Sequence, residues 1–206
     1  EDERGFDSLL IQIQAAIGLG DAAVARWGCE LLEAKHPPSL SNAEQVQLMA
    51  ALRAKIAILA GADREGEIEA AARAHPDGLI LRSILFDELP PESQLRKGFI
   101  EDIRPVINNE LTLRERVHSA EMLYSAGQYS LAADLYEPLH GQSDSYALRR
   151  RPEALYLADR RAEERKLFES LPGVRRAASR YLYVGTNISH RAGLLTPALR
   201  LVATAL

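Results

Sequence analysis

Residues that often carry chemistry are few and scattered in this 206-residue chain. Nothing basic adjoins the single cysteine, Cys29, in the sequence to activate its thiol as a nucleophile. No phosphate-binding loop, His-Glu-x-x-His motif or Gly-x-Ser-x-Gly motif occurs. No histidine pairs with another histidine or with the cysteine at a metal-binding spacing. The five histidines are His36, His75, His118, His140 and His190. We therefore expect no catalytic residues, no metal site and no cofactor, and we expect that the protein is not an enzyme.

Two of the histidines stand directly before proline, in His36-Pro37 and His75-Pro76. Proline cannot continue a helix, and a histidine near a helix end can bond the last carbonyl groups. The two dipeptides therefore predict helix ends rather than ligands. Because nothing basic adjoins Cys29, we expect a buried structural thiol rather than a nucleophile.

The elements that position these residues are revealed by an internal repeat. When the chain is aligned with itself, 121–141 matches 153–173 without a gap, and 8 of the 21 positions are identical. The identical pairs are Glu121/Glu153, Leu123/Leu155, Tyr124/Tyr156, Ala126/Ala158, Leu135/Leu167, Glu137/Glu169, Leu139/Leu171 and Gly141/Gly173. The two segments are 32 residues apart, and repeats of this length are typical of stacked helical units.

Each half of the repeat has the apolar spacing of a helix. The halves are joined at residues 127–130, where Gly127 tolerates positive φ and Ser130 is expected to cap the second helix. Helices joined by so short a turn must be antiparallel, and each pair leaves an apolar stripe that only neighbouring pairs can cover. The sequence thus predicts a stack of helical hairpins, and no period-2 alternation suggests a sheet.

The pattern of small and apolar residues resembles the tetratricopeptide repeat family. The residues that match its signature are Gly127, Ala132, Tyr136 and Leu139; Gly20, Ala25, Cys29, Leu32 and Pro37; and Gly193, Ala198 and Val202. The resemblance is weaker over 43–110, where the turn at Gly61 reads as irregular and 77–110 holds two helices around Pro90-Pro91 without a signature. Asp144 also stands where the family has proline.

The resemblance implies an all-α fold, an α-solenoid of about six antiparallel helical hairpins in a right-handed superhelix. We expect a single repeat domain over 1–206. Its hairpins are expected at 6–38, 43–76, 77–110 (irregular), 113–142, 145–173 and 175–206.

Two local signals predict helix starts inside this scheme. Capping boxes are expected at Ser41 with Glu44 and at Thr112 with Glu115. Pro152 does not fit the pattern, because the helix must either begin there or kink there.

In the tetratricopeptide family the first helix of each hairpin lines a concave groove that holds a protein or peptide partner. The resemblance therefore implies a binding groove whose residues are Arg114, Glu121, Tyr124, Tyr146, Arg149, Glu153, Tyr156, Arg180, Tyr183, Asn187 and His190. Tyrosine and arginine are the residues that dominate interface energetics. The alternative is that Tyr124 and Tyr156 pack between hairpins, with their hydroxyl groups satisfied by a nearby glutamate.

Charge is divided unevenly along the chain. Residues 145–206 carry 12 Lys or Arg and 5 Asp or Glu, whereas 1–144 carry 13 and 24. Arginines recur in this basic third as Arg149, Arg150 and Arg151; Arg160, Arg161 and Arg165; and Arg175, Arg176 and Arg180. The alternative function is therefore a regulatory or sensor solenoid whose arginines contact nucleic acid or an acidic partner.

The ends of the chain lead to two further expectations. The sequence lacks a starting methionine, so we expect a module of a longer, bacterial-type regulatory, assembly or defence protein. The last residues, 194–206, form an apolar segment that we expect to self-associate or to cover another domain. No apolar run is long enough to span a bilayer and no signal peptide is visible, so we expect a cytoplasmic protein, or a periplasmic one if an upstream signal was removed.

Overall fold

The regular structure is helical throughout the part of the chain that the computed structural model describes, residues 3–37, 42–107, 111–139 and 147–170. No strand occurs in these ranges, which confirms the all-α prediction. The predicted hairpin at 175–206 lies outside them. The chain divides into two compact units, residues 1–122 and 123–206.

The first unit contains α1 to α6, one short 3-10 helix and most of α7. They are α1 (Glu3–Gly18), α2 (Ala22–Lys35), α3 (Ala43–Leu59), α4 (Arg64–Ala74), α5 (Leu79–Phe86), α6 (Gln94–Ile103), η1 (Arg104–Val106) and α7 (Leu113–Ser125), whose last residues belong to the second unit. The second unit continues with α8 (Tyr129–Tyr136), η2 (Glu137–Leu139), α9 (Ala147–Leu157) and α10 (Arg161–Ser170). Two helices, α5 and α6, flank Pro90-Pro91 as expected.

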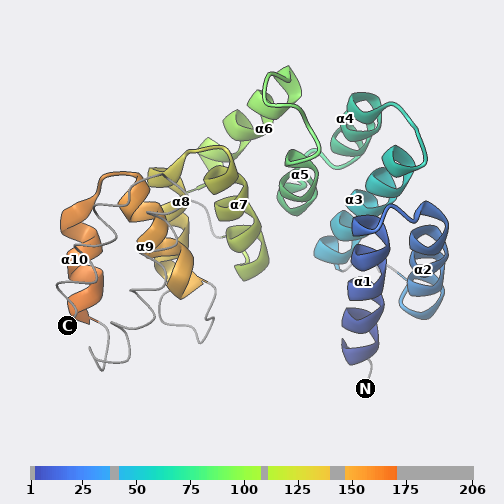
Figure 1. The fold of residues 1–206 in the computed structure, drawn as a ribbon, viewed down its shortest axis with the longest axis horizontal. Coiled ribbons are helices and arrows are strands. Elements are labelled where there is room, and N and C mark those ends of the chain that lie inside the picture. The colour runs from blue at the N-terminus through green and yellow to red at the C-terminus, as the bar shows by residue number, and fades with distance from the viewer. Residues whose placement is uncertain (1–2, 38–41, 108–110, 140–146, 171–206) are drawn as a thin grey trace. The chain divides into compact units, whose positions relative to one another are not determined.

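The first unit is built on a row of alternate helices. α3 packs against α1 on one side and α5 on the other, and α2 and α4 lie on the same side of this row (Figure 1). Phe6, Ile13, Cys29, Leu32 and Leu52 form part of its apolar core. Burial of each such side chain stabilises the fold by about 1.5–3 kcal/mol.

Gly28 lets α1 and α2 approach closely. A Cβ atom at this position would lie 2.8 Å from Cγ1 of the buried Ile13. Any larger residue would push the two helices apart, because a packed core transmits such a displacement.

One turn geometry ends four of the helices. Gly20, Gly61, Gly127 and Asp159 all have positive φ, and the next residue donates its backbone N–H to the carbonyl five residues back at 2.8–3.0 Å. This is the Schellman motif that closes a helix at a left-handed residue. The prediction of an irregular turn at Gly61 is therefore wrong, because the same backbone bonds form there as at Gly20.

The internal repeat is present in the backbone as well as in the sequence. Asp159 occupies the position equivalent to Gly127, with φ of 58° and 74° respectively. Tyr124 and Tyr156 are also equivalent, and in each copy the residue five positions later contacts the tyrosine ring. Tyr129 contacts Tyr124, and Arg161 lies over Tyr156. The two copies therefore share a helix, a Schellman turn and a second helix.

One of the three predicted helix caps is confirmed by the structure. The capping box at Thr112 and Glu115 is confirmed: the Glu115 N–H donates to Thr112 Oγ1 at 3.2 Å, and the Thr112 N–H donates to Glu115 Oε2 at 2.9 Å. The cap predicted at Ser41 is wrong by one residue, since Asn42 accepts the Gln45 N–H and α3 begins at the next residue. Ser130 is not a cap either, because α8 already begins at Tyr129.

Helix ends at the two His-Pro dipeptides are confirmed. His36 and His75 follow α2 and α4 with nearly identical backbone angles, φ −131° and −130°. Pro152 lies inside α9 and is buried, so the helix does not begin there. α9 packs against α8 and α10, around a core that includes Leu135, Tyr136 and Leu155.

Candidate binding pocket

The residues assigned to the predicted groove fall into three groups. Arg114 is exposed, with Nε 3.6 Å from Glu44 Oε2, and Glu121 is half-buried, both within the first unit. Tyr124, Glu153 and Tyr156 belong to the second unit. Those that lie outside the described residues are Tyr146, Arg180, Tyr183, Asn187 and His190, together with the side chain of Arg149. The groove as a whole stays a prediction.

Tyr124 and Glu153 are brought together. The Tyr124 hydroxyl donates to the Glu153 carboxylate, and burial followed by this carboxylate raises the pKa of Tyr124. The Arg150 guanidinium carbon lies 4.7 Å from the ring centroid, and Arg150 Nη1 lies 3.2 Å from Glu153 Oε2. Within the second unit, Arg150 lies over the Tyr124 ring, Tyr129 contacts the ring at an edge, and Glu153 bonds the hydroxyl group. These contacts agree with the alternative in which Tyr124 packs inside the fold and a glutamate satisfies its hydroxyl group.

Tyr156 is covered in a related way. Its side chain is 9 % exposed, and the Arg161 guanidinium carbon lies 3.6 Å from the ring centroid. A cation on the ring face is favourable by about 0.5–2 kcal/mol. A partner could reach the covered face of either ring only by moving an arginine.

Most arginines of the predicted basic strip whose side chains the structure describes are paired locally. Arg151 Nη2 lies 2.9 Å from Glu137 Oε1, and Arg160 bonds Asp134 and Glu163. Arg150 and Arg161 likewise contact carboxylates, and Arg165 is exposed. Charge neutralised in this way attracts phosphates weakly, so these arginines do not favour the nucleic-acid alternative.

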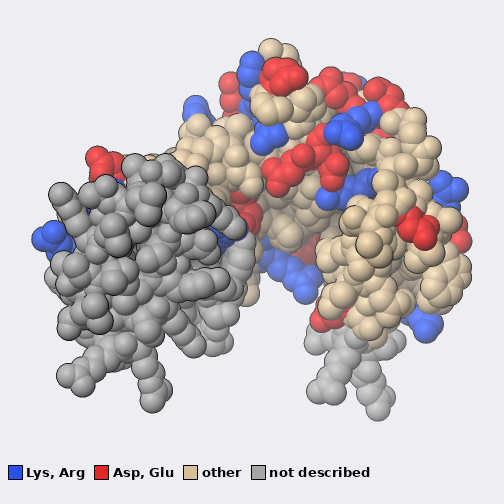
Figure 2. Space-filling view, in the orientation of Figure 1, with Lys and Arg blue, Asp and Glu red and all other residues tan. Residues whose placement is uncertain are grey.

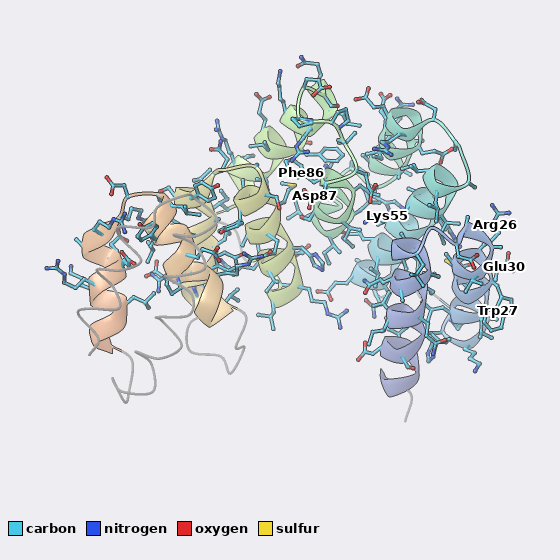
Figure 3. All side chains as sticks on the ribbon, in the orientation of Figure 1. Arg26, Trp27, Glu30, Lys55, Phe86 and Asp87 are labelled. Carbon is cyan, nitrogen blue, oxygen red and sulfur yellow. The ribbon has the colours of Figure 1, made fainter. Side chains whose placement is uncertain are left out.

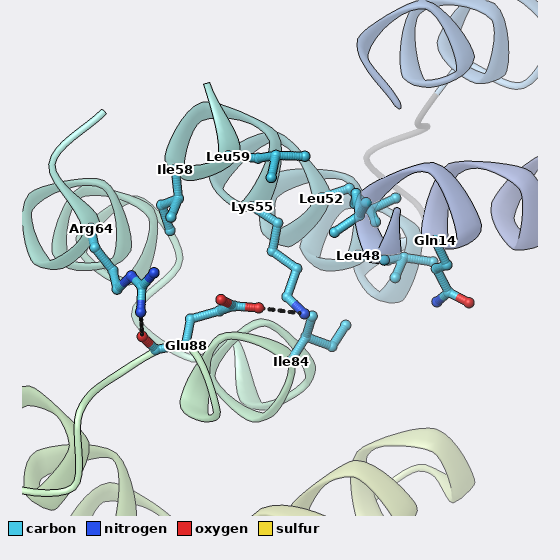
Figure 4. A pocket seen from close by; sticks show the side chains of 11 residues that line it. Gln14, Leu48, Leu52, Lys55, Ile58, Leu59, Arg64, Ile84 and Glu88 are labelled. Carbon is cyan, nitrogen blue, oxygen red and sulfur yellow. Dashed lines mark hydrogen bonds and ion pairs between the residues drawn. The ribbon is translucent and has the colours of Figure 1, made fainter. Parts of the chain in front are cut away.

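A pocket of about 640 Å³ lies between α1, α3 and α5 in the first unit (Figure 4). Its volume is within the range of about 300–1,000 Å³ that is typical of ligand sites. The residues that line it are Gln14, Ile17, Gly18, Leu48, Leu52, Lys55, Ile58, Leu59, Arg64, Ile84 and Glu88. Six of them are aliphatic, so the walls are largely apolar.

The apolar walls arise from one stripe along α3. Leu48, Leu52, Lys55 and Leu59 follow each other at intervals of three or four residues, so they lie on one face of the helix. Leu48 and Leu52 are buried against neighbouring helices, whereas Leu59 is half-buried. Lys55 interrupts the stripe with a charge.

The charge of Lys55 is neutralised by Glu88, which belongs to another hairpin. Lys55 Nζ lies 2.9 Å from Glu88 Oε1, and both side chains are about one quarter exposed. Arg64, the first residue of α4, donates from Nη1 to the backbone carbonyl of Glu88 at 3.2 Å. The aliphatic stem of Lys55 can cover apolar surface while its ammonium group meets the carboxylate. Chemically, the pocket can bury an aliphatic group and hold a polar group at its rim.

A smaller hollow of about 220 Å³ lies between α2 and α3, with Cys29 in its wall. Cys29 is buried as predicted, and its Sγ lies 3.7 Å from Glu33 Oε1. Burial, and then the charge of Glu33, raise the pKa of Cys29 to about 11. Such a thiol is a poor nucleophile at neutral pH. Within the described ranges no group of three or more His, Cys, Asp or Glu side chains could hold a metal ion.

Exposed apolar side chains mark the outer side of α2. Trp27 is 61 % exposed and projects from this helix beside Arg26 and Glu30 (Figure 3). Elsewhere on this face of the molecule, acidic and basic side chains are interspersed over α4 to α6 (Figure 2).

The pocket was missed by reasoning from the sequence. Its apolar walls come from three helices, Arg64 from a fourth, and Lys55 and Glu88 belong to different hairpins. The available signal is the apolar stripe of α3 with one lysine in it, which marks a helix face that is only partly covered. That signal does not reveal which helices stand opposite.

Comparison with known proteins returns no match among protein-family models, curated proteins or solved structures. No helix in the described part of the chain has the length and apolar character needed to cross a membrane.

Proposed function

We propose that the protein is a helical-repeat scaffold of the tetratricopeptide type, which binds a segment of a protein or peptide partner. The shared turn geometry at Gly20, Gly61, Gly127 and Asp159 supports a repeated hairpin. Hairpins that stack leave one row of helices open to a partner.

One observation carries the proposal: the apolar walls of the pocket of about 640 Å³ come from α1, α3 and α5, the first helices of three successive hairpins, with Arg64 of α4 at the rim. Several aliphatic side chains there remain partly exposed, including Ile17, Ile58 and Ile84. A partner that buries them gains about 25 cal/mol for each Å² of apolar surface removed from water. The proposed binding site therefore lies in the first unit rather than around Tyr124 and Tyr156.

Selection of random dodecapeptides displayed on phage against the whole chain tests the proposal. Peptides that are enriched are synthesised, and their affinities are measured by calorimetry for the unchanged chain and for Ile84→Glu. We expect this substitution to weaken binding at least about tenfold, because it puts a charge into the apolar wall.

The matched control is Ile11→Glu, which changes an aliphatic residue that is 64 % exposed and lies outside the pocket. Ile58→Ser, a milder change in the pocket wall, is measured as well, and thermal unfolding shows which variants are folded. Absence of enriched peptides overturns the proposal. Enriched peptides whose affinity is unchanged in folded Ile84→Glu and Ile58→Ser also overturn it.

A further inference from the structure

The rim of the pocket carries an excess of positive charge. Lys55, Arg64 and Glu88 are the charged residues that line it, which gives two positive groups and one negative group. Lys55 and Glu88 form an ion pair at 2.9 Å and offset each other. The remaining positive charge is on Arg64.

The Arg64 guanidinium has hydrogen-bonding capacity that the fold does not use. Among the described residues its partner is the backbone carbonyl of Glu88, a neutral acceptor, and no carboxylate pairs with it there. The neighbouring Asp63 is engaged in capping α4, since it accepts the Gly66 N–H at 2.9 Å. A guanidinium has five N–H donors in a geometry that matches a carboxylate. Arg64 is therefore a charged donor with most of its capacity directed to solvent at the edge of an apolar pocket.

The position of Arg64 is unfavourable for its own helix. It is the first residue of α4, where the helix dipole favours negative groups, and Asp63, Glu65 and Glu67 around it follow that rule. A positive charge at this place gains little from the helix. A carboxylate bound by Arg64 would remove the conflict.

Charge complementarity thus defines the occupant. We propose that the bound segment presents an aliphatic side chain with a carboxylate side chain beside it. The aliphatic group enters between α1, α3 and α5, and the carboxylate binds Arg64. This inference rests on the proposed function and specifies the chemistry of the partner at the same site.

The wider charge of the first unit does not reverse this preference. Residues 1–122 carry more acidic than basic side chains, but charges farther than about 8 Å from Arg64 are screened at physiological ionic strength. Of the acidic residues next to Arg64, Asp63 is already engaged as the α4 cap. A carboxylate in hydrogen-bonding contact with Arg64 responds mainly to that group. A basic residue of a partner would instead have to displace Lys55 from Glu88.

Short synthetic peptides test the inference on the whole chain. The probes are nonapeptides Gly-Ser-Ser-Leu-Xaa-Leu-Ser-Ser-Gly, acetylated and amidated, in which Xaa is Glu, Gln or Lys. A fourth peptide has Gln at Xaa and a free terminal carboxylate, which separates a side-chain carboxylate from a terminal one. Affinities are measured by calorimetry at low and physiological salt. We expect the Glu peptide to bind about three- to tenfold more tightly than the Gln peptide, and the Lys peptide to bind most weakly.

Charge reversal supplies the decisive comparison. Arg64→Glu should invert the order, so that the Lys peptide binds best. Arg73→Glu, on the same helix but outside the pocket, should leave the order unchanged. If Arg64→Glu proves unstable, Arg64→Gln should remove the preference for Glu over Gln.

Three outcomes overturn the inference. Equal binding of the Glu, Gln and Lys peptides shows an apolar site without charge selection. Preference for the free terminus over the Glu side chain assigns a different carboxylate. Absence of binding by all four peptides, while display-selected peptides still lose affinity in Ile84→Glu, rejects this occupant but keeps the proposed function.

Discussion

Individual polar side chains in this protein are mostly engaged by near neighbours, and this decides which of them are available to a partner. Tyr124 is bonded to Glu153 and covered by Arg150, and Tyr156 lies under Arg161. Arg64, by contrast, has a single neutral acceptor among the described residues. Residue type alone favoured the tyrosines as binding groups. Local pairing favours the arginine.

Cys29 provides a test of local electrostatics. Because its pKa is raised to about 11, the thiolate population at pH 7.5 should be roughly 100-fold below that of an exposed cysteine. Reaction with an aromatic disulfide reagent should be correspondingly slow and should accelerate up to about pH 11. Glu33 raises the pKa, so Glu33→Gln should move the midpoint of the rate profile to lower pH.

Glu30→Gln is the matched control, because Glu30 contributes least to the raised pKa. The midpoint of the pH profile separates a changed pKa from altered access, which changes the rate at every pH. A midpoint near that of a small thiol in the unchanged chain would show that the charge and burial around Cys29 are misjudged.

At the scale of the element, a common turn joins helices into hairpins whatever residue occupies it. Three of the four left-handed positions are glycine, and the fourth is Asp159. A left-handed conformation costs most residues about 1–2 kcal/mol, and less for Asp. A Cβ atom at Gly127 would meet nothing within 4 Å, so substitution there tests backbone strain without a clash.

Gly127→Ala should lower the free energy of unfolding by about 1 kcal/mol, and Asp159→Gly should raise it by about 0.5 kcal/mol. The second variant also removes the ion pair between Asp159 and Arg161, which is exposed and contributes little to stability. Denaturant unfolding at equilibrium measures both changes.

Gly98→Ala is the control for these turn variants. Gly98 lies inside α6 with nothing near its Cβ position, so alanine should stabilise the chain by about 0.5–1 kcal/mol. If Gly127→Ala and Gly98→Ala change the free energy of unfolding in the same direction, the assigned role of the left-handed turn is contradicted.

For the whole molecule, the central question is whether the hairpins form an array in which each unit depends only on its neighbours. Such an array tolerates the loss of one complete repeat, because the interfaces on either side of the deletion are equivalent. The aligned segments 121–126 and 153–158 place that deletion well, since four of their six residues are identical.

Removal of residues 127–158 joins Ala126 to Asp159 and preserves the helix that precedes the turn. We expect the shortened chain to keep a helical circular dichroism spectrum and cooperative thermal unfolding. Removal of 127–142, half a repeat, should abolish cooperative unfolding because it leaves one helix of a hairpin without its partner. The solenoid proposal fails if the two deletions behave alike.

The features that the sequence by itself determined depend on residues that are close together in the chain. The helical periods, the glycine turns, the His-Pro helix ends and the capping box at Thr112 all depend on backbone bonds and side chains within about five residues. The internal repeat was also readable, since it compares the chain only with itself. Errors at this level were small, such as the cap at Asn42 instead of Ser41.

Only the tertiary structure decided which side chains are covered and which form a pocket. Lys55 on α3 meets Glu88, which follows α5, and Arg160 meets Asp134 on α8. Burial and pairing of this kind depend on the identity of the facing helix and on its rotation about its axis, which no local pattern specifies. For that reason the all-α class of the fold could be read from the sequence, while the position of the candidate binding site could not.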